Sequence, residues 1–226
     1  MKIIARIRND FKEKFGIPRQ SGILENFEST IIFEPEYRVK EALRGIEGYS
    51  HLWLIWEFSE AKRDKFSPTV RPPRLGGNKR MGVFATRSPF RPNPIGLSSV
   101  RLLEVRDTKN EGTVLIVSGA DLLDGTPIYD IKPYLTFADS HPEATSGFAD
   151  EVKDYSLEVD FPAELIEKIP PEKRDSLLRL LADDPRPSYI SDGERIYTFS
   201  FAEYEISFKV DENILTVTDI KKGHHT

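Results

Sequence analysis

Residues 67–98 limit what this chain can fold into more than any other stretch of the sequence. They include six prolines and four glycines, a composition that excludes a helix and most of a central strand. A loop of this length inside a compact domain is either functional or disordered. We favour a functional loop, because prolines lower the entropy lost on ordering and apolar residues can anchor it. A rigid structural loop is the alternative; the candidate anchors are Met81, Val83, Phe84 and Ile95.

Short segments rich in β-branched and aromatic residues make up most of the remaining N-terminal part. Gly, Pro, Asn or Asp bounds each segment, and no long helical pattern separates them, which favours an antiparallel barrel or sandwich. One short helix is expected at 36–45. No G-x-G-x-x-G sequence follows a strand, so a Rossmann cofactor site is not expected. The expected strands are 2–8, 29–33, 50–58, 82–86, 97–105, 113–117 and 155–159.

The pattern changes near residue 160. A two-proline start and closely spaced leucines predict a helix over 172–184, and three short strands are expected to follow it, at 195–201, 203–210 and 214–219. We therefore predict two domains. They are a mainly β domain over 1–160 and a small α+β domain over 161–226.

Composition excludes several classes of protein and site. With 226 residues, of which 38% are hydrophobic, the chain can bury a core, so global disorder is excluded. There is no cysteine, which removes disulfides, thiol nucleophiles and thiolate–zinc sites and fits a reducing cytoplasm. The four histidines form no H-x-x-x-H pair, so no metal site is expected. No apolar run is long enough for a membrane span, and no export signal is recognised.

Positive charge is concentrated in one part of an acidic chain. The formal net charge is −5, yet the segment from Lys62 to Arg106 carries +9 and the remainder −14. A local cationic face on an acidic protein is typical of a site for a polyanion. The alternative is an ordinary solvated surface.

Two further polar turns are candidates for binding a small ligand. Residues 18–22 (PRQSG) follow a basic stretch, and residues 121–127 (DLLDGTP) follow a strong strand. Backbone groups and a carboxylate in the second turn are suited to a ribose or a sulfonium. A simple hairpin at Asp124–Gly125 is the alternative.

Long motifs in the chain resemble a known family. The sequences HLWLIWEF (51–58), the basic loop from Arg71 to Ser98, DLLDGTPIYDIKPYL (121–135) and PRQSG (18–22) strongly resemble the TsaA-like family. The closer match is to its TrmO-type tRNA (adenine-N6)-methyltransferases. The tail sequence DDPRPSY (183–189) resembles the QDPRPAY element of the longer bacterial members, with Asp183 in place of Gln.

The resemblance implies a fold, a reaction and a cofactor. It implies a single-sheeted antiparallel β-barrel that binds S-adenosylmethionine, commonly as a homodimer with the cofactor near the subunit interface. It also implies methylation of N6 on the threonylcarbamoyl-adenosine at position 37, next to the anticodon of threonine tRNA. The cofactor contacts carried over by motif are Pro18, Arg19, Gln20, Ser59, Glu60, Arg87, Leu97, Asp121, Leu122, Asp124, Gly125 and Thr126.

The reaction itself suggests roles for charged residues. A carbamoylated adenine nitrogen is a weak nucleophile, so a carboxylate that accepts its proton would assist transfer. We predict Asp124 or Asp139 as this base, although a turn residue and a cap are the alternative roles. Arg87 or Arg91 is predicted to hold the threonyl carboxylate. The residues predicted to contact tRNA, mainly its phosphates, are Arg71, Arg74, Lys79, Arg80, Arg91 and Arg186.

Single-stranded loops are read by stacking on aromatic rings, for which Phe84, Phe90 and Tyr134 are candidates, each with a core position as the alternative. Two other functions fit the same sequence. One is a non-catalytic RNA-binding barrel, and the other is a methyltransferase of a small-molecule amine on the same scaffold. Binding of S-adenosylmethionine separates the first of these from an enzyme, and the methylated product separates the second.

Overall fold

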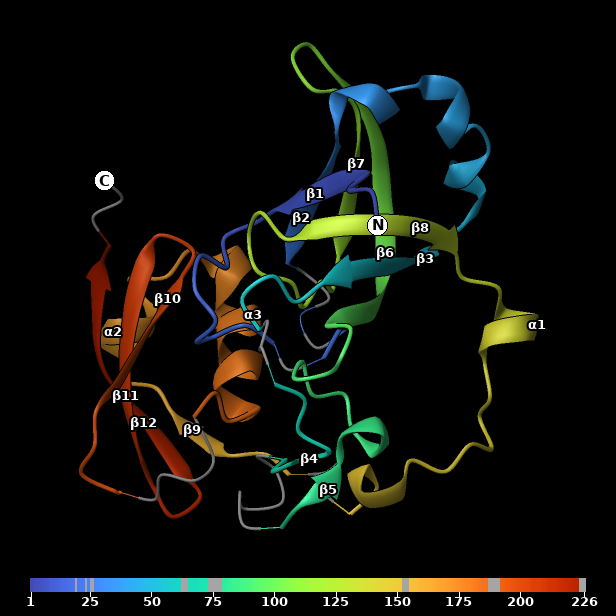
Figure 1. Cartoon of the computed structure of the whole chain (residues 1–226). Coiled ribbons are helices and arrows are strands. Elements are labelled where there is room, and N and C mark those ends of the chain that lie inside the picture. Colours follow the sequence, from blue (N-terminus) through green and yellow to red (C-terminus); the bar gives the residue numbers. More distant parts are fainter. Residues whose placement is uncertain are drawn as a thin grey trace.

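The computed structural model describes residues 1–18, 20–22, 24, 27–61, 65–72, 79–151, 155–186 and 192–223. Over these residues the chain is mainly β, as predicted, and it forms two bodies of structure that lie side by side (Figure 1). None of the helices in this part of the chain is both long and apolar enough to cross a membrane.

The first body is a single sheet that closes on itself. Its strands pair antiparallel in the order β1-β2-β7-β6-β3-β8, and β8 returns to β1 through Ala5 and Arg6. Alternate side chains point inward, and Leu52, Leu54 and Leu115 are fully buried in its core. The strands are β1 (Ala5–Arg8), β2 (Glu28–Phe33), β3 (His51–Glu57), β6 (Ile95–Thr108), β7 (Gly112–Ser118) and β8 (Pro127–Pro133).

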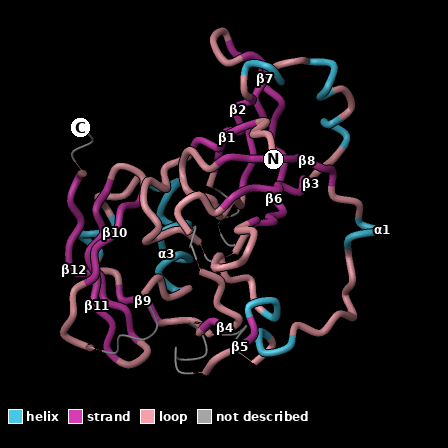
Figure 2. Tube along the Cα trace, viewed as in Figure 1, coloured by secondary structure: helices cyan, strands magenta, loops and turns pink. Residues whose placement is uncertain are grey.

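The second body is a four-stranded sheet covered by a helix. Its strand order is β10-β11-β12-β9, with β9 parallel to β12. Helix α3 (Pro171–Ala182) begins at a proline, as predicted, and buries Leu177, Leu180 and Leu181. It lies between this sheet and the barrel (Figures 1 and 2). The other elements are β9 (Glu158–Asp160), α2 (Ala163–Ile166), β10 (Tyr197–Phe201), β11 (Tyr204–Asp211) and β12 (Ile214–Lys222).

The loop between β1 and β2 belongs to the core of the second body. Phe11 and Phe27 stack with ring centroids 4.6 Å apart, and both are buried in the same cluster as the α3 leucines. The boundary predicted at 160/161 therefore cuts through packing on both sides of it. It separates β9 from the sheet that β9 joins. It also assigns the β1–β2 loop to the barrel domain, although Phe11 and Phe27 of this loop are buried in the core of the second body.

Two local predictions are wrong. Residues 36–45 form short 3₁₀ turns rather than one helix, because Val39 and Ala42 are exposed and have no core to pack against. The strand predicted at 82–86 is only the two-residue β5 (Met81–Gly82), paired with β4 (Thr69–Val70). The remaining elements are α1 (Thr136–Asp139) and the 3₁₀ turns Pro35–Tyr37, Lys40–Leu43, Ile46–Gly48, Val83–Ala85 and Gly147–Ala149.

Candidate functional site

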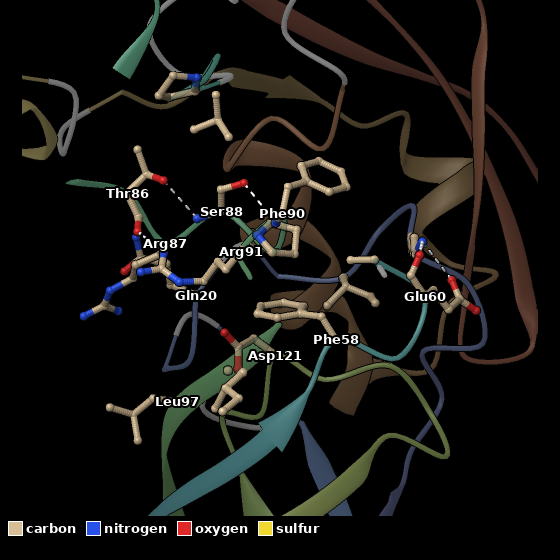
Figure 3. Close-up of a pocket in the computed structure, with 18 of the residues that line it drawn as sticks. Gln20, Phe58, Glu60, Thr86, Arg87, Ser88, Phe90, Arg91, Leu97 and Asp121 are labelled. Atoms are coloured by element: carbon tan, nitrogen blue, oxygen red, sulfur yellow. Dashed lines mark hydrogen bonds and ion pairs between the residues drawn. The ribbon is translucent and has the colours of Figure 1, made fainter. Parts of the chain in front are cut away.

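A cavity of about 1070 Å³ lies at the end of the barrel where β3 ends and β6 begins. Cavities that bind small molecules usually have volumes of about 300 to 1,000 Å³, so this one has room for a small ligand and part of a second. Figure 3 shows Gln20, Arg87, Phe58 and Asp121, which come from four separate segments, around one hollow. The two polar turns and the proline-rich loop singled out in the sequence therefore meet at one place.

Asp121 is the carboxylate at the barrel end of this cavity. Its Oδ1 accepts a hydrogen bond from the Ser98 hydroxyl at 2.5 Å, and the Trp56 indole N–H donates to the Ser98 oxygen at 2.9 Å. Burial raises the pKa of Asp121 above its usual range, although the Ser98 hydrogen bond, backbone amides and the charge of Arg87 oppose this. A carboxyl group with a raised pKa is a better proton acceptor than an ordinary aspartate.

The barrel register explains how this chain of hydrogen bonds forms. Trp56 on β3 lies opposite Gly96 on β6, and a Cβ atom at position 96 would lie 2.2 Å from the Trp56 ring. Because glycine has no Cβ atom, the indole ring can lie flat against β6. Its N–H then reaches Ser98, which faces the barrel interior and is 1% exposed.

Two other acidic side chains line the cavity. Tyr129 donates a short hydrogen bond to Glu57, and this bond raises the pKa of Tyr129 to about 12. Glu60 forms an ion pair with Lys14 at 3.0 Å, and Figure 3 shows it on the side of the view away from Arg87. Both carboxylates thus have partners of their own, whereas the charge of Arg87 acts on Asp121.

Arginines from the proline-rich loop form the opposite wall. The Arg91 Nη1 group donates to the carbonyl oxygens of Val83 at 3.2 Å and Thr86 at 2.7 Å, which fixes the guanidinium at the cavity. Arg71, Arg80 and Arg87 also line the cavity, are exposed, and make no ion pair with any residue that the structure describes. This wall can bind a carboxylate or phosphate.

The structure brings most of the predicted ligand-binding residues to this cavity. Arg19 and Arg74 lie outside the described residues. Leu122 is fully buried and Gly125 is in a turn with φ of 74°; neither lines the cavity. The predicted residues that do line it are Pro18, Gln20, Ser59, Glu60, Arg71, Arg80, Arg87, Arg91, Leu97, Asp121 and Thr126.

Two basic residues predicted to contact tRNA lie away from the cavity wall. Lys79 is exposed and precedes Arg80 in the middle of the proline-rich loop. Arg186 lies in the second body, where its guanidinium forms a bidentate ion pair with Asp184 at 2.8 and 2.9 Å. Its pKa is raised by that hydrogen-bonded pair, so part of its charge is already neutralised within the chain.

The two aspartates predicted as bases have structural partners outside the cavity. Asp124 accepts from the Asn9 backbone N–H at 2.9 Å and pairs with Lys12 at 2.7 Å. Asp139 accepts from the Trp53 indole at 3.0 Å and from the Leu135 N–H at 2.8 Å. These are the turn and capping roles that the sequence analysis gave as alternatives. Neither residue lines the cavity, whereas Asp121 does.

Two protein-family models match this chain. A family model described as the tRNA-methyltransferase O N-terminal domain matches residues 6–140, and one described as the TrmO C-terminal domain matches residues 154–223. The chain belongs to the tRNA-methyltransferase O family. The resemblance inferred from its motifs is therefore confirmed.

Relatives within and around this family match most of the chain. An Escherichia coli protein named tRNA (adenine(37)-N6)-methyltransferase is 42% identical over 217 residues, which cover 92% of each chain. A Pyrococcus abyssi protein, named a probable S-adenosyl-L-methionine-binding protein, is 37% identical over 73% of this chain and 90% of its own. A crystal structure of TrmO from Pseudomonas aeruginosa superposes with a TM-score of 0.76 at 32% identity, covering 98% of this chain and 95% of that one.

Sequence reasoning missed three parts of this TrmO-family site. Trp56, Gly96 and Ser98 lie inside motifs that the sequence analysis quoted, but nothing in a linear pattern shows that they meet across two strands. The spacing Gly-x-Ser in a strand, opposite a tryptophan, was the available signal, since glycine inside a strand often marks a close approach. Within the part of the chain that the structure describes, no cluster of His, Asp and Glu is suited to a metal ion.

Proposed function

We propose that this protein transfers a methyl group from S-adenosylmethionine to N6 of adenine 37 in tRNA. The observation that supports this most directly is the single cavity that places Asp121 opposite an arginine wall. Membership of the tRNA-methyltransferase O family and the names of the relatives agree with it. A site in which a partly buried carboxylate, Asp121, lies opposite several arginines suits an anionic RNA and a cationic methyl donor together.

The cavity residues fit the proposed cofactor in their chemistry. Asp121 supplies negative charge for a sulfonium, Arg87 supplies a cation for a carboxylate, and Phe58 offers an aromatic face for adenine. S-adenosylmethionine would supply an electrophilic methyl group there: the new N–C bond would form as the methyl–sulfur bond breaks, N6 would lose one proton, and the neutral thioether S-adenosylhomocysteine would leave. The residues proposed to hold it are Pro18, Gln20, Ser59, Glu60, Arg87, Leu97, Asp121 and Thr126.

We assign the proton to the carboxylate of Asp121. The Ser98 hydroxyl and the Trp56 indole hold this carboxylate in one orientation, so it needs little rearrangement to accept a proton. Its raised pKa brings its basicity closer to that of the N6 group than an exposed aspartate would. Asp121 therefore takes the role that the sequence analysis divided between Asp124 and Asp139.

We propose that the acceptor adenine carries a threonylcarbamoyl group, as in threonine tRNA. Carbonyls of Val83 and Thr86 occupy only one nitrogen of the Arg91 guanidinium. Its remaining N–H groups can pair with the threonyl carboxylate, a geometry that favours arginine. Arg71, Lys79 and Arg80 are placed to contact phosphates of the anticodon stem-loop.

Mass spectrometry of nucleosides tests the reaction. Purified protein, S-adenosylmethionine with an isotopically labelled methyl group, and threonine tRNA with or without the threonylcarbamoyl group are incubated and digested. We expect label only on the threonylcarbamoyl-adenosine. Label on unmodified adenosine would contradict the substrate assignment. The absence of saturable S-adenosylmethionine binding by calorimetry would support the non-catalytic RNA-binding barrel, and cofactor binding without label transfer to tRNA would support a small-molecule amine as the acceptor.

We also propose that two copies pair through the outer face of β6. Leu97 and Leu103 are 57% and 43% exposed, and both lie on this face. Because Leu97 also lines the cavity, a second copy seated here would lie beside the cofactor. Light scattering is expected to give twice the 25.8 kDa mass of one chain, and a monomer mass would contradict the pairing. A cytoplasmic location stays a prediction from composition.

A further inference from the structure

Two aromatic side chains next to the cavity are exposed to solvent. Phe66 is 58% and Phe84 is 71% exposed, and their ring centroids lie 6.3 Å apart with an angle of 25° between the planes. The short β4–β5 ladder brings them together, because Phe66 precedes β4 and Phe84 follows β5. From the sequence, Phe84 was a candidate both for anchoring the loop in a core and for stacking on a base; its exposure shows that the prediction of a core anchor is wrong.

The turn that carries Phe84 is held in place by the buried Val83 and by hydrogen bonds to its carbonyl oxygen. Val83 is 1% exposed and is the true anchor of the turn. Its carbonyl accepts bonds from the Thr86 hydroxyl at 2.9 Å and from Arg91. The Arg91 guanidinium lies 5.7 Å from the centre of the Phe84 ring. Because the turn is already ordered, a ligand that stacks on Phe84 orders little additional chain.

The segment of the chain that carries the two rings is basic. The sequence contains no acidic residue from Lys65 to Leu103. Lys65, Arg71 and Arg80 are exposed, and the last two line the cavity. Flat aromatic surface beside cations is the combination that binds single-stranded nucleic acid, since bases stack on rings while cations contact phosphates.

We propose that Phe66 and Phe84 form a stacking platform for an unpaired base of the anticodon loop, next to the base that enters the cavity. This inference rests on the proposed function, because that function makes an anticodon loop the substrate. When the target adenine is in the cavity with Asp121, its neighbours in the loop lie at the mouth, where the platform is. The base stacks there and the Arg91 guanidinium faces the same ring.

Binding of an anticodon stem-loop RNA tests the platform. We compare the parent with Phe84→Leu, Phe66→Leu and Phe84→Tyr by fluorescence anisotropy across a range of salt concentrations. The leucine variants are expected to bind about tenfold more weakly, because one stacked base is lost. Phe84→Tyr, which keeps a ring, is expected to bind like the parent. Phe137→Leu is the matched control, since Phe137 is 90% exposed but lies in α1, outside the basic loop.

Two readouts separate stacking from charge and from misfolding. The slope of log affinity against log salt is expected to stay unchanged in Phe84→Leu but to fall by about one in Arg71→Ala. RNA with 2-aminopurine at each unpaired loop position in turn is expected to lose fluorescence at one position on binding the parent, and not on binding Phe84→Leu. Equal RNA affinity for parent and leucine variants would overturn the platform alone. A parent that binds no RNA would overturn the proposed function as well.

Discussion

Replacing Asp121 with asparagine is expected to lower the methylation rate by a factor of about 10² to 10⁴. The amide keeps the size of the side chain and an oxygen that accepts the Ser98 hydrogen bond, but it cannot accept a proton from the acceptor nitrogen. Single-turnover methylation at saturating tRNA and cofactor measures this loss. Affinity for tRNA is expected to change much less than the rate.

The matched control is Asp124→Asn, the same chemical change three residues further along the chain. Asp124 pairs with Lys12 outside the cavity, and a partly exposed ion pair of this kind contributes about 0.2 to 1 kcal/mol. We therefore expect Asp124→Asn to methylate tRNA within a few-fold of the parent. The opposite result, with Asp124→Asn inactive and Asp121→Asn active, would return the role of the base to Asp124.

Asp121→Asn is also expected to raise the free energy of unfolding at neutral pH. Burial raises the folded-state pKa of Asp121 above the unfolded value of about 3.9. As the pH rises through that value, the unfolded chain loses its proton first, so the parent loses stability until the folded pKa is passed. The asparagine variant has no group that titrates here, so its free energy of unfolding does not fall over this pH range. Urea unfolding of both proteins is expected to show a difference at pH 7 that shrinks as the pH approaches 4.

Ser98→Ala tests whether Asp121 depends on its support. This change leaves the Trp56 indole N–H without its acceptor, and a buried unpaired donor costs about 1 to 3 kcal/mol. We expect lower stability, a smaller loss of rate than in Asp121→Asn, and a shifted pH profile of the rate. An unchanged pH profile would show that Ser98 serves only the fold.

Local patterns predicted the parts of the fold that local forces determine. Helix α3 was foreseen because a proline start and a leucine stripe act over a few residues. Strand β8 was missed because prolines stand at both of its ends, at Pro127 and Pro133. The helix expected at 36–45 failed for a different reason: Leu43 packs against the barrel core, but Val39 and Ala42, which would share its helical face, are exposed, and the segment forms 3₁₀ turns instead.

Part of the membership of the cavity could be predicted from the sequence, but its geometry could not. Motif resemblance gathered Gln20, Arg87 and Asp121 correctly around one cavity. Which of several aspartates faces that cavity depends on tertiary contacts, because Asp124 and Asp139 carry the same chemistry but meet Lys12 and Trp53 instead. A sequence shows that a carboxylate is available, but only the packing shows what it touches.

The loop between β1 and β2 connects the second body to the cavity. Phe11 and Phe15 of this loop pack into the second core, while Ile17 and Pro18 line the cavity. Gly16 lies between the two sets with φ of 92°, and a Cβ atom there would lie 2.2 Å from the buried Phe199 ring. The position therefore requires glycine both for its backbone and for its close contact.

Gly16→Ala is accordingly expected to be strongly destabilising. The left-handed backbone costs about 1 to 2 kcal/mol for alanine, and overpacking against Phe199 adds about 1 to 3 kcal/mol. Gly22→Ala is the matched control, because Gly22 has φ of 86° but nothing within 4 Å of its added Cβ atom. We expect the first variant to lower the melting temperature by roughly 10 °C and the second by only a few degrees.

The same pair of variants tests whether the second body supports the cavity. Below the melting temperature of both proteins, calorimetry is expected to show weaker S-adenosylmethionine binding by Gly16→Ala than by Gly22→Ala, because the clash with Phe199 displaces the loop that carries Ile17 and Pro18. Equal melting temperatures for the two variants would show that the loop can move away from Phe199 without cost. A large loss of stability with unchanged cofactor affinity would show instead that the cavity keeps its shape independently of the second core, so that this part of the chain serves folding and not the site.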